Sequence, residues 1–267
     1  MPHTTLNFKE NFVQLDNVTL KLKWINSAPE GAADRPILVF LHDSLGCIKL
    51  WRDFPEKLAM ATGCTALVYD RQGYGESAPF TTLKRDHDYL EREADVLHNL
   101  LEQQQVKSAI LFGHSDGGSI ALLAAAKYSK LITGVITEGA HVFVEDVTLA
   151  GIRLAVAAYK ETNLREKLMK YHQDKTDDVF NAWTETWLSE GYRNWNIELF
   201  LPALFCPVLV IQGEADEYGT LAQVEDIVQQ VQGPANQLII PKIGHTPHRE
   251  AEVDVLQHST DFINRLR

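Results

Sequence analysis

The sequence predicts an α/β fold: a doubly wound, mostly parallel eight-stranded sheet with helices on both faces and an inserted helical cap. Three observations support this fold class. Short β-rich apolar bursts alternate with amphipathic stretches, which is typical of parallel strands joined by crossover helices. One long region interrupts this alternation with helical patterns alone. The 267 residues, 45% of them hydrophobic, are enough to bury one large core.

Eight apolar bursts have the length and composition of strands. Residues 6–15 and 18–24 are expected to form an antiparallel pair, because Asp16 and Asn17 between them favour a turn. The other expected strands are 37–41, 66–69, 109–112, 132–137, 208–211 and 237–240. In an open sheet of this kind the active groups lie at the carboxyl ends of the strands.

Helical patterns separate these bursts, at residues 51–61, 88–104, 119–128, 221–231 and 252–266. Residues 145–201 contain helical patterns but no strand-like burst, and they are rich in aromatic side chains. We interpret residues 141–201 as a helical cap inserted into a core formed by residues 1–140 and 202–267. Most of its aromatics are expected to form its own core. Trp183 and Trp187, spaced i and i+4 on one helix face, are expected to reach the pocket.

Composition and charge limit the partners and the compartment. The formal net charge of −11 argues against nucleic acid, and it disfavours anionic substrates unless a local Arg or Lys offsets it. Residues 1–10 contain no apolar run, and no stretch is long enough to span a bilayer, so we expect no secretory signal and no membrane partner. Three scattered cysteines suit a reducing compartment, so a cytoplasmic location is expected. The oligomeric state stays open.

The segment G-H-S-D-G at residues 113–117 matches the G-x-S-x-G pattern of a nucleophile turn. It directly follows an apolar strand and precedes a helix rich in small residues. Such a turn strains the serine backbone, so the positions two residues away must lack bulk, and Gly113 and Gly117 meet this need. Ser115 is therefore the predicted nucleophile, at a helix N-terminus that favours a developing oxyanion.

A serine hydroxyl needs a base, and the base needs a carboxylate that orients it. The loop after the strand at 208–211 offers Glu214, Asp216 and Glu217, and we select Asp216 because its position carries the carboxylate beyond the turn. The loop after the last strand offers His245 and His248. We select His245, since Gly244 before it lets the loop approach the serine.

The loop after the first parallel strand is expected to supply a second backbone donor to the oxyanion. Ser44 and Asp116 are the two predicted donors, and His42 is interpreted as a hydrogen-bonded organiser of this loop. No phosphate-binding glycine loop occurs, and no His, Cys or Asp cluster has metal-ligand spacing, so we expect neither a cofactor nor a metal. The candidate pocket residues are His42, Asp43, His114, Trp183 and Trp187.

These motifs together resemble those of the α/β-hydrolase superfamily over nearly the whole chain. Residues 69–77, Y-D-R-Q-G-Y-G-E-S, resemble its D-x-R-G-x-G-x-S loop, and Leu41-His42 resembles its L-H-G strand end. Asp43 and Gln72 stand where glycines are usual, and Asp43 puts a side chain where the backbone normally approaches the substrate. The serine turn and the aromatic cap are similar to those of valacyclovir-hydrolase-like amino-ester hydrolases and small carboxylesterases.

This resemblance implies hydrolysis of a small carboxylic ester through an acyl-enzyme, with a small molecule as the partner. One alternative is carbon–carbon bond hydrolysis or lyase chemistry on a diketone or enolic acid, for which Arg153 and Arg193 are candidate cations. Another is a ligand-binding protein that keeps the fold without turnover. Asp116 beside the nucleophile could pair with a substrate ammonium group, as an amino-acid ester would require, or could favour the helix start.

Overall fold

The structure is a computed structural model that describes residues 6–27 and 35–266. The expectation about a signal or anchor at residues 1–10 falls partly on residues 1–5, which lie outside the described residues. Within the described ranges, no helix has the length and apolar character needed to cross a membrane.

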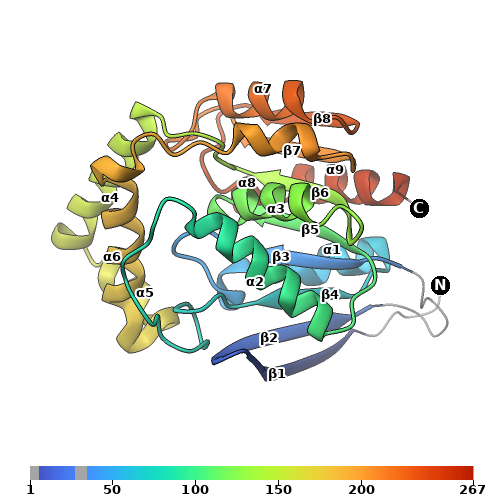
Figure 1. Cartoon of the computed structure of the whole chain (residues 1–267), viewed down its shortest axis with the longest axis horizontal. Helices are drawn as coiled ribbons and strands as arrows, with labels where there is room; N and C mark the ends of the chain where they lie inside the picture. The colour runs from blue at the N-terminus through green and yellow to red at the C-terminus, as the bar shows by residue number, and fades with distance from the viewer. Residues whose placement is uncertain (1–5, 28–34, 267) are drawn as a thin grey trace.

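The described residues form an eight-stranded sheet in the order β1-β2-β4-β3-β5-β6-β7-β8 (Figure 1). The β1–β2 and β2–β4 pairs are antiparallel, and the other five pairs are parallel. The predicted fold class is confirmed. The strands are β1 Asn7–Leu15, β2 Val18–Asn26, β3 Ile37–Leu41, β4 Ala66–Tyr69, β5 Ala109–His114, β6 Ile132–Glu138, β7 Val208–Gly213 and β8 Ala235–Ile240.

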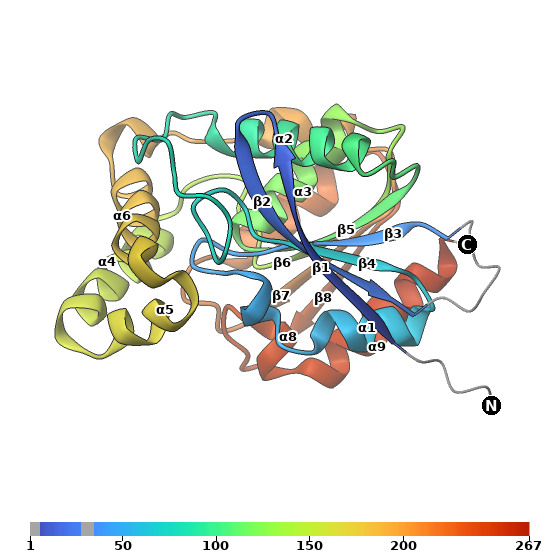
Figure 2. The same cartoon turned by 90° about the horizontal axis from the view of Figure 1, so that it is seen from below.

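Helices cover both faces of the sheet, and each face has its own hydrophobic cluster. Alternate residues of β3 illustrate this, because Val39 and Leu41 pack with α2, α3 and α7 while Leu38 and Phe40 pack with α1 and α9. Figure 2 shows α2 and α3 on one side of the strands and α1, α8 and α9 on the other. These helices are α1 Phe54–Thr62, α2 Tyr89–Gln103, α3 Asp116–Lys127, α7 Leu221–Gln230, α8 Pro247–Glu250 and α9 Glu252–Arg265.

Two predicted helix starts were wrong. The first helix begins at Phe54 rather than at residue 51, because Pro55 suits only the first turn of a helix and the preceding residues Ile48–Trp51 form the short turn η1. The helix α3 begins at Asp116 rather than at residue 119, because the chain turns into it directly after Ser115.

A helical insertion lies between β6 and β7, at one end of the sheet (Figure 1). His172 attaches it to the core, since its Nε2–H donates to the Leu45 carbonyl (2.9 Å) and its Nδ1 accepts from the Gly75 N–H (3.1 Å). Buried Lys175 donates to the carbonyls of Tyr74 and Ser77. The elements of the insertion are α4 Asp146–Glu161, α5 Leu164–His172, η2 Gln173–Lys175, α6 Thr176–Trp187, η3 Glu190–Tyr192 and η4 Glu198–Ala203. The predicted boundaries of a cap domain, 141 and 201, stay a prediction.

The turn from β5 into α3 holds Ser115 in a rare backbone conformation, with φ 56° and ψ −121°. Its flanking glycines lie against backbone: a Cβ on Gly113 would be 2.2 Å from the Gly117 carbonyl oxygen, and one on Gly117 would be 2.0 Å from the Leu41 carbonyl oxygen. The Ser115 N–H donates to the Glu138 carbonyl (2.8 Å), which ties the turn to the end of β6. Close packing of three strand ends therefore compensates the strain.

Substitution of Gly117 by Ala should destabilise the protein, because the new methyl group meets backbone that cannot move without separating β3 from α3. We expect a loss of roughly 2–3 kcal/mol in the free energy of unfolding, measured by urea denaturation. Gly191→Ala is the matched control, since a Cβ there meets nothing within 4 Å. Equal stability of the two variants would contradict the close packing of the turn.

Candidate active site

Asp216 and His245 come together from two loops at the carboxyl edge of the sheet. The His245 Nδ1–H donates to the Asp216 carboxylate, at 2.9 Å from Oδ1 and 2.8 Å from Oδ2. Two further donors hold this carboxylate, the Tyr218 N–H on Oδ1 (2.8 Å) and Gln212 Nε2 on Oδ2 (2.7 Å). Asp216 is thus fixed as an acceptor, and the second ring nitrogen of His245, Nε2, is left for another partner.

Burial alone would raise the pKa of Asp216, but the charge and hydrogen bond of His245 hold it below its ordinary value. Burial opposes protonation of His245, yet the Asp216 carboxylate outweighs it and raises the pKa of His245 above the ordinary 6.5. The histidine is therefore a stronger base than a free imidazole.

The competing residues considered from the sequence have other partners. Glu214 is exposed, and Glu217 accepts a hydrogen bond from the His245 backbone N–H (3.2 Å) without engaging the ring of His245. His248 is buried and pairs through Nδ1 with Glu138 Oε2 at 2.5 Å. Of these candidates, Asp216 and His245 are the pair that meets side chain to side chain.

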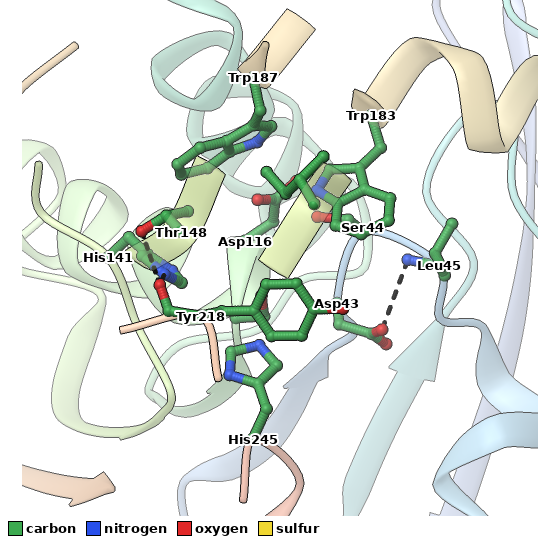
Figure 3. A pocket seen from close by; sticks show the side chains of 12 residues that line it. Asp43, Ser44, Leu45, Asp116, His141, Thr148, Trp183, Trp187, Tyr218 and His245 are labelled. Carbon is green, nitrogen blue, oxygen red and sulfur yellow. Dashed lines mark hydrogen bonds between the residues drawn. The ribbon is translucent and has the colours of Figure 1, made fainter. Parts of the chain in front are cut away.

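Ser115 and His245 line the same cavity. This cavity lies between the sheet and the helical insertion (Figure 3). The Ser115 hydroxyl has no hydrogen-bond partner among the described residues. Such bonds are often long until a substrate is bound. Core loops and the helices α4 and α6 build the walls, which consist of Asp43, Ser44, Leu45, Ser115, Asp116, His141, Thr148, Ile152, Trp183, Trp187, Tyr218 and His245.

The predicted oxyanion donors, Ser44 and Asp116, both border this cavity beside Ser115. In the described part of the chain the Ser44 N–H has no acceptor. Asp116 is the first residue of α3, where N–H groups have no acceptor within the helix. The Asp116 carboxylate accepts from the Tyr89 hydroxyl (3.0 Å), which in turn accepts from Trp187 Nε1 (3.1 Å). The insertion is thereby linked to the residue next to Ser115.

Two residues predicted for the pocket, His42 and His114, do not line this cavity. His42 Nε2 accepts from the Arg71 N–H (3.1 Å) and its Nδ1–H donates to the Asp43 carbonyl (2.8 Å), so its ring bonds to both of these segments. His114 Nε2–H donates to the His245 carbonyl (2.7 Å). Burial lowers the pKa of His114 to about 4 and that of His42 well below its usual value, so both are neutral.

Asp43, Trp183 and Trp187, the other predicted pocket residues, all line the cavity. The Asp43 Oδ2 accepts from the Leu45 N–H at 3.4 Å (Figure 3). Burial opposes ionisation of Asp43, but nearby His114, His42 and Arg249 lower the pKa of its carboxyl below the ordinary value. It therefore carries a negative charge at neutral pH.

Sequence reasoning missed a buried group of Glu138, His114 and His248, whose side-chain nitrogen and oxygen atoms lie within 4.8 Å of one another. It is the one group of three possible metal-ligating residues among the described parts of the chain. Glu138 and His248 are hydrogen-bonded to each other, and His114 donates to the backbone of His245. The group therefore helps to hold the His245 loop in position. The charged last residue of an otherwise apolar strand was the signal that could have identified Glu138.

The alpha/beta hydrolase family profile matches residues 38–257 of this chain. A curated relative, serine hydrolase BPHL of Homo sapiens, is 31% identical over 213 residues, 74% of this chain and 69% of that protein. The protein of the same name in Mus musculus is 32% identical over 195 residues, 69% of this chain and 64% of that protein. This chain matches about two thirds of the length of these relatives.

Solved structures show the same fold at low identity. A 2-hydroxy-6-oxo-6-phenylhexa-2,4-dienoate hydrolase from a Rhodococcus strain superposes with a TM-score of 0.79 at 16% identity, covering 96% of this chain and all of that one. An enol-lactonase from Burkholderia xenovorans gives 0.74 at 17% identity, covering 95% of this chain and all of that one. At identities this low, the similarity shows a common fold but not a common activity.

Replacement of Asp216 by Asn should lower kcat/KM for hydrolysis by roughly 10³- to 10⁴-fold, because the histidine loses the carboxylate that orients it and stabilises its charge. A base must be neutral, so activity of the unmodified chain should fall as the pH drops through a His245 pKa above 6.5. In Asp216→Asn this acid limb should move to lower pH. The measurement is the pH profile of kcat/KM.

Glu217→Gln is the matched control for this prediction, since it removes a carboxylate that bonds only to the backbone of His245 and should change the activity little. An equal loss in both variants, or an acid limb that does not move in Asp216→Asn, would contradict the assigned pairing.

Proposed function

The chain belongs to the alpha/beta hydrolase family, and from this premise we propose that it hydrolyses a small carboxylic ester through an acyl-enzyme on Ser115. One observation carries the proposal. The His245 ring is held at Nδ1 by Asp216 and borders the same cavity as the Ser115 hydroxyl. A proton relay needs this arrangement, with one ring nitrogen anchored and the other available to the nucleophile.

The reaction proceeds in two steps. Ser115 Oγ attacks the ester carbonyl while His245 takes its proton, and the resulting imidazolium then protonates the departing alkoxide, which leaves as the alcohol. In the second step His245 takes a proton from water as that water attacks the acyl-enzyme. The attack gives a tetrahedral intermediate. As this intermediate collapses, His245 returns the proton to Ser115 Oγ, which restores the hydroxyl and releases the carboxylic acid. Asp216 keeps the ring in the required tautomer and stabilises its transient positive charge.

The negative charge that develops on the carbonyl oxygen needs donors that are already in position. The N–H groups of Ser44 and Asp116 fulfil this role in the proposal, one from each loop beside Ser115. The N-terminal end of α3 adds a favourable electrostatic contribution, because its dipole is positive there.

The helical insertion acts as a cap over the reacting groups in this proposal. Two of its helices contribute to the cavity wall, α4 through Thr148 and Ile152 and α6 through Trp183 and Trp187. Such apolar walls exclude water and suit a small acyl group.

The charge of the cavity favours a neutral or cationic acyl group over an anionic one. Its wall contains two carboxylates, Asp43 and Asp116, and none of the described lining residues is Lys or Arg. The candidate cations for an anionic substrate, Arg153 and Arg193, line a separate surface hollow, and Arg193 pairs there with Asp146. Arg153 and Arg193 therefore do not support carbon–carbon bond hydrolysis of an enolic acid in this cavity.

Ser115→Ala should abolish labelling by a fluorophosphonate probe and reduce p-nitrophenyl acetate turnover by roughly 10³-fold or more, because the variant lacks the hydroxyl on which the acyl-enzyme is proposed to form. Intact-protein mass spectrometry and a colorimetric assay measure the two effects. Ser44→Ala is the matched control, since it removes a second cavity hydroxyl but keeps the backbone donor. Persistent labelling of Ser115→Ala would refute the proposal, and binding without turnover in the unmodified chain would favour a non-catalytic protein.

Asp116 is proposed to pair with the ammonium group of an amino-acid ester. Asp116→Asn should lower kcat/KM for the p-nitrophenyl ester of alanine by about 10-fold more than for p-nitrophenyl propanoate, which has the same carbon chain without the ammonium group. Asp43→Asn tests the other cavity carboxylate under the same conditions. An unchanged preference in Asp116→Asn would rule out the cation site at this residue.

A further inference from the structure

A second hollow adjoins the catalytic cavity and has no part in the mechanism above. It lies between α5 of the insertion and two core segments, η1 and α8, which are neighbours in Figure 2. Asp43 and Leu45 line both spaces, so the hollow is adjacent to the cavity that contains the reacting groups. Its volume is about 350 Å³, whereas the catalytic cavity holds about 80 Å³. The smaller space suits a small acyl group, so the rest of a substrate needs the larger one.

The charge of this hollow is opposite to that of the catalytic cavity. Four cations line it, Arg52, Lys167, Lys170 and Arg249, against the single carboxylate of Asp43. All four are exposed, and none forms an ion pair with an acid in the described ranges. We call this space the basic hollow. A group of unpaired cations in a chain of net charge −11 creates a local positive field that attracts an anion.

The histidines on its wall do not change this balance. His42 and His114 are neutral because burial lowers their pKa values, and His248 is paired with the buried carboxylate of Glu138. Asp43 lies on the wall shared with the catalytic cavity. An anionic group is therefore expected beside the cations of the hollow, two of which, Lys167 and Lys170, come from α5, rather than beside Asp43.

Apolar side chains form much of the remaining wall. Leu50 and Trp51 come from the core, and Leu164 and Leu168 come from α5. A ligand that fits has an apolar stem along these side chains and an anionic end among the cations.

The chain segment that carries the proposed base also contributes to the hollow, and this indicates which part of the substrate enters it. Its wall includes Thr246 and Arg249, which follow the proposed base His245 along the chain. Because His245 protonates the leaving oxygen, the leaving group lies on the side of this loop. The acyl group then occupies the aromatic cavity under α4 and α6.

We propose that the basic hollow is the leaving-group subsite, and that the preferred substrates are esters whose alcohol part has an apolar stem ending in a carboxylate or a phosphate. This inference rests on the proposed ester hydrolysis for its catalytic meaning. Binding of the alcohol part alone depends only on the hollow.

The first test therefore measures binding without turnover. Ser115→Ala is titrated with 3-(4-hydroxyphenyl)propanoate, with 3-(4-hydroxyphenyl)propyl phosphate and with the neutral 3-(4-hydroxyphenyl)propanamide, followed by ligand-observed NMR. The two anions should bind roughly 5- to 10-fold more tightly than the amide at low ionic strength, and salt should reduce the difference. A phosphate preference over carboxylate, or the reverse, identifies the anionic end.

Two double variants in the Ser115→Ala background distinguish binding by the cations of the hollow from a general effect of the protein's net charge. Lys167→Gln with Lys170→Gln should remove most of the preference for the anions. The matched control is Lys107→Gln with Lys130→Gln, which makes the same change of charge in a different surface hollow. Equal binding of the anions and the amide, or an equal loss in both double variants, would overturn the subsite.

Turnover then distinguishes this inference from the proposed function. With Ser115 intact, the propanoyl esters of the two anionic phenols should exceed the ester of the amide in kcat/KM by roughly 5- to 10-fold, mainly through KM. Turnover of all three esters at equal rates would contradict the subsite and leave ester hydrolysis standing. Selective binding of the anionic alcohols without hydrolysis of any ester would support the hollow and contradict the proposed function.

Discussion

The backbone turn at Ser115 is the constraint on which the rest of the site depends. A non-glycine residue at φ 56° is unfavourable on its own, by a cost of order 1–3 kcal/mol, so the surroundings must hold it. Here the ends of β3, β5 and β6 close around the turn, with Gly117 against the Leu41 carbonyl and the Ser115 N–H bonded to Glu138. The same packing brings the loop that carries Ser44 to the serine.

Buried histidines hold the loops around this turn. His42 joins the Asp43 loop to Arg71, His114 supports the backbone of His245, and His172 anchors the insertion to Leu45. Burial lowers the pKa of each of these three, so they act as neutral hydrogen-bonding groups. His245 differs because a carboxylate faces its ring and raises its pKa. These four residues have the same side chain, so the surroundings of each imidazole determine its role.

The sequence predicts features that depend on neighbouring residues. It does not predict contacts between residues that are far apart along the chain. Strand bursts, the glycines of the serine turn and the order of Ser115, Asp216 and His245 are local patterns. The sheet could therefore be predicted from the sequence, and the candidate catalytic residues could be proposed from it. The Glu138–His248 pair joins residues 110 positions apart, and the basic hollow joins α5 to η1 and α8. Nothing in the local sequence indicates such contacts. His42 and His114 were predicted for the pocket, and they line the basic hollow rather than the catalytic cavity, because proximity in sequence to a catalytic loop does not fix the direction of a side chain.

Acyl transfer to Ser115 can be observed directly by peptide mass spectrometry after p-nitrophenyl acetate turnover is stopped in acid. We predict one acetyl group per chain, on the peptide that contains Ser115, appearing within the first turnover and disappearing as the ester is exhausted. Ester hydrolysis at an undiminished rate with no acetyl on Ser115, or with a stable acetyl on another residue, would contradict the role of this serine.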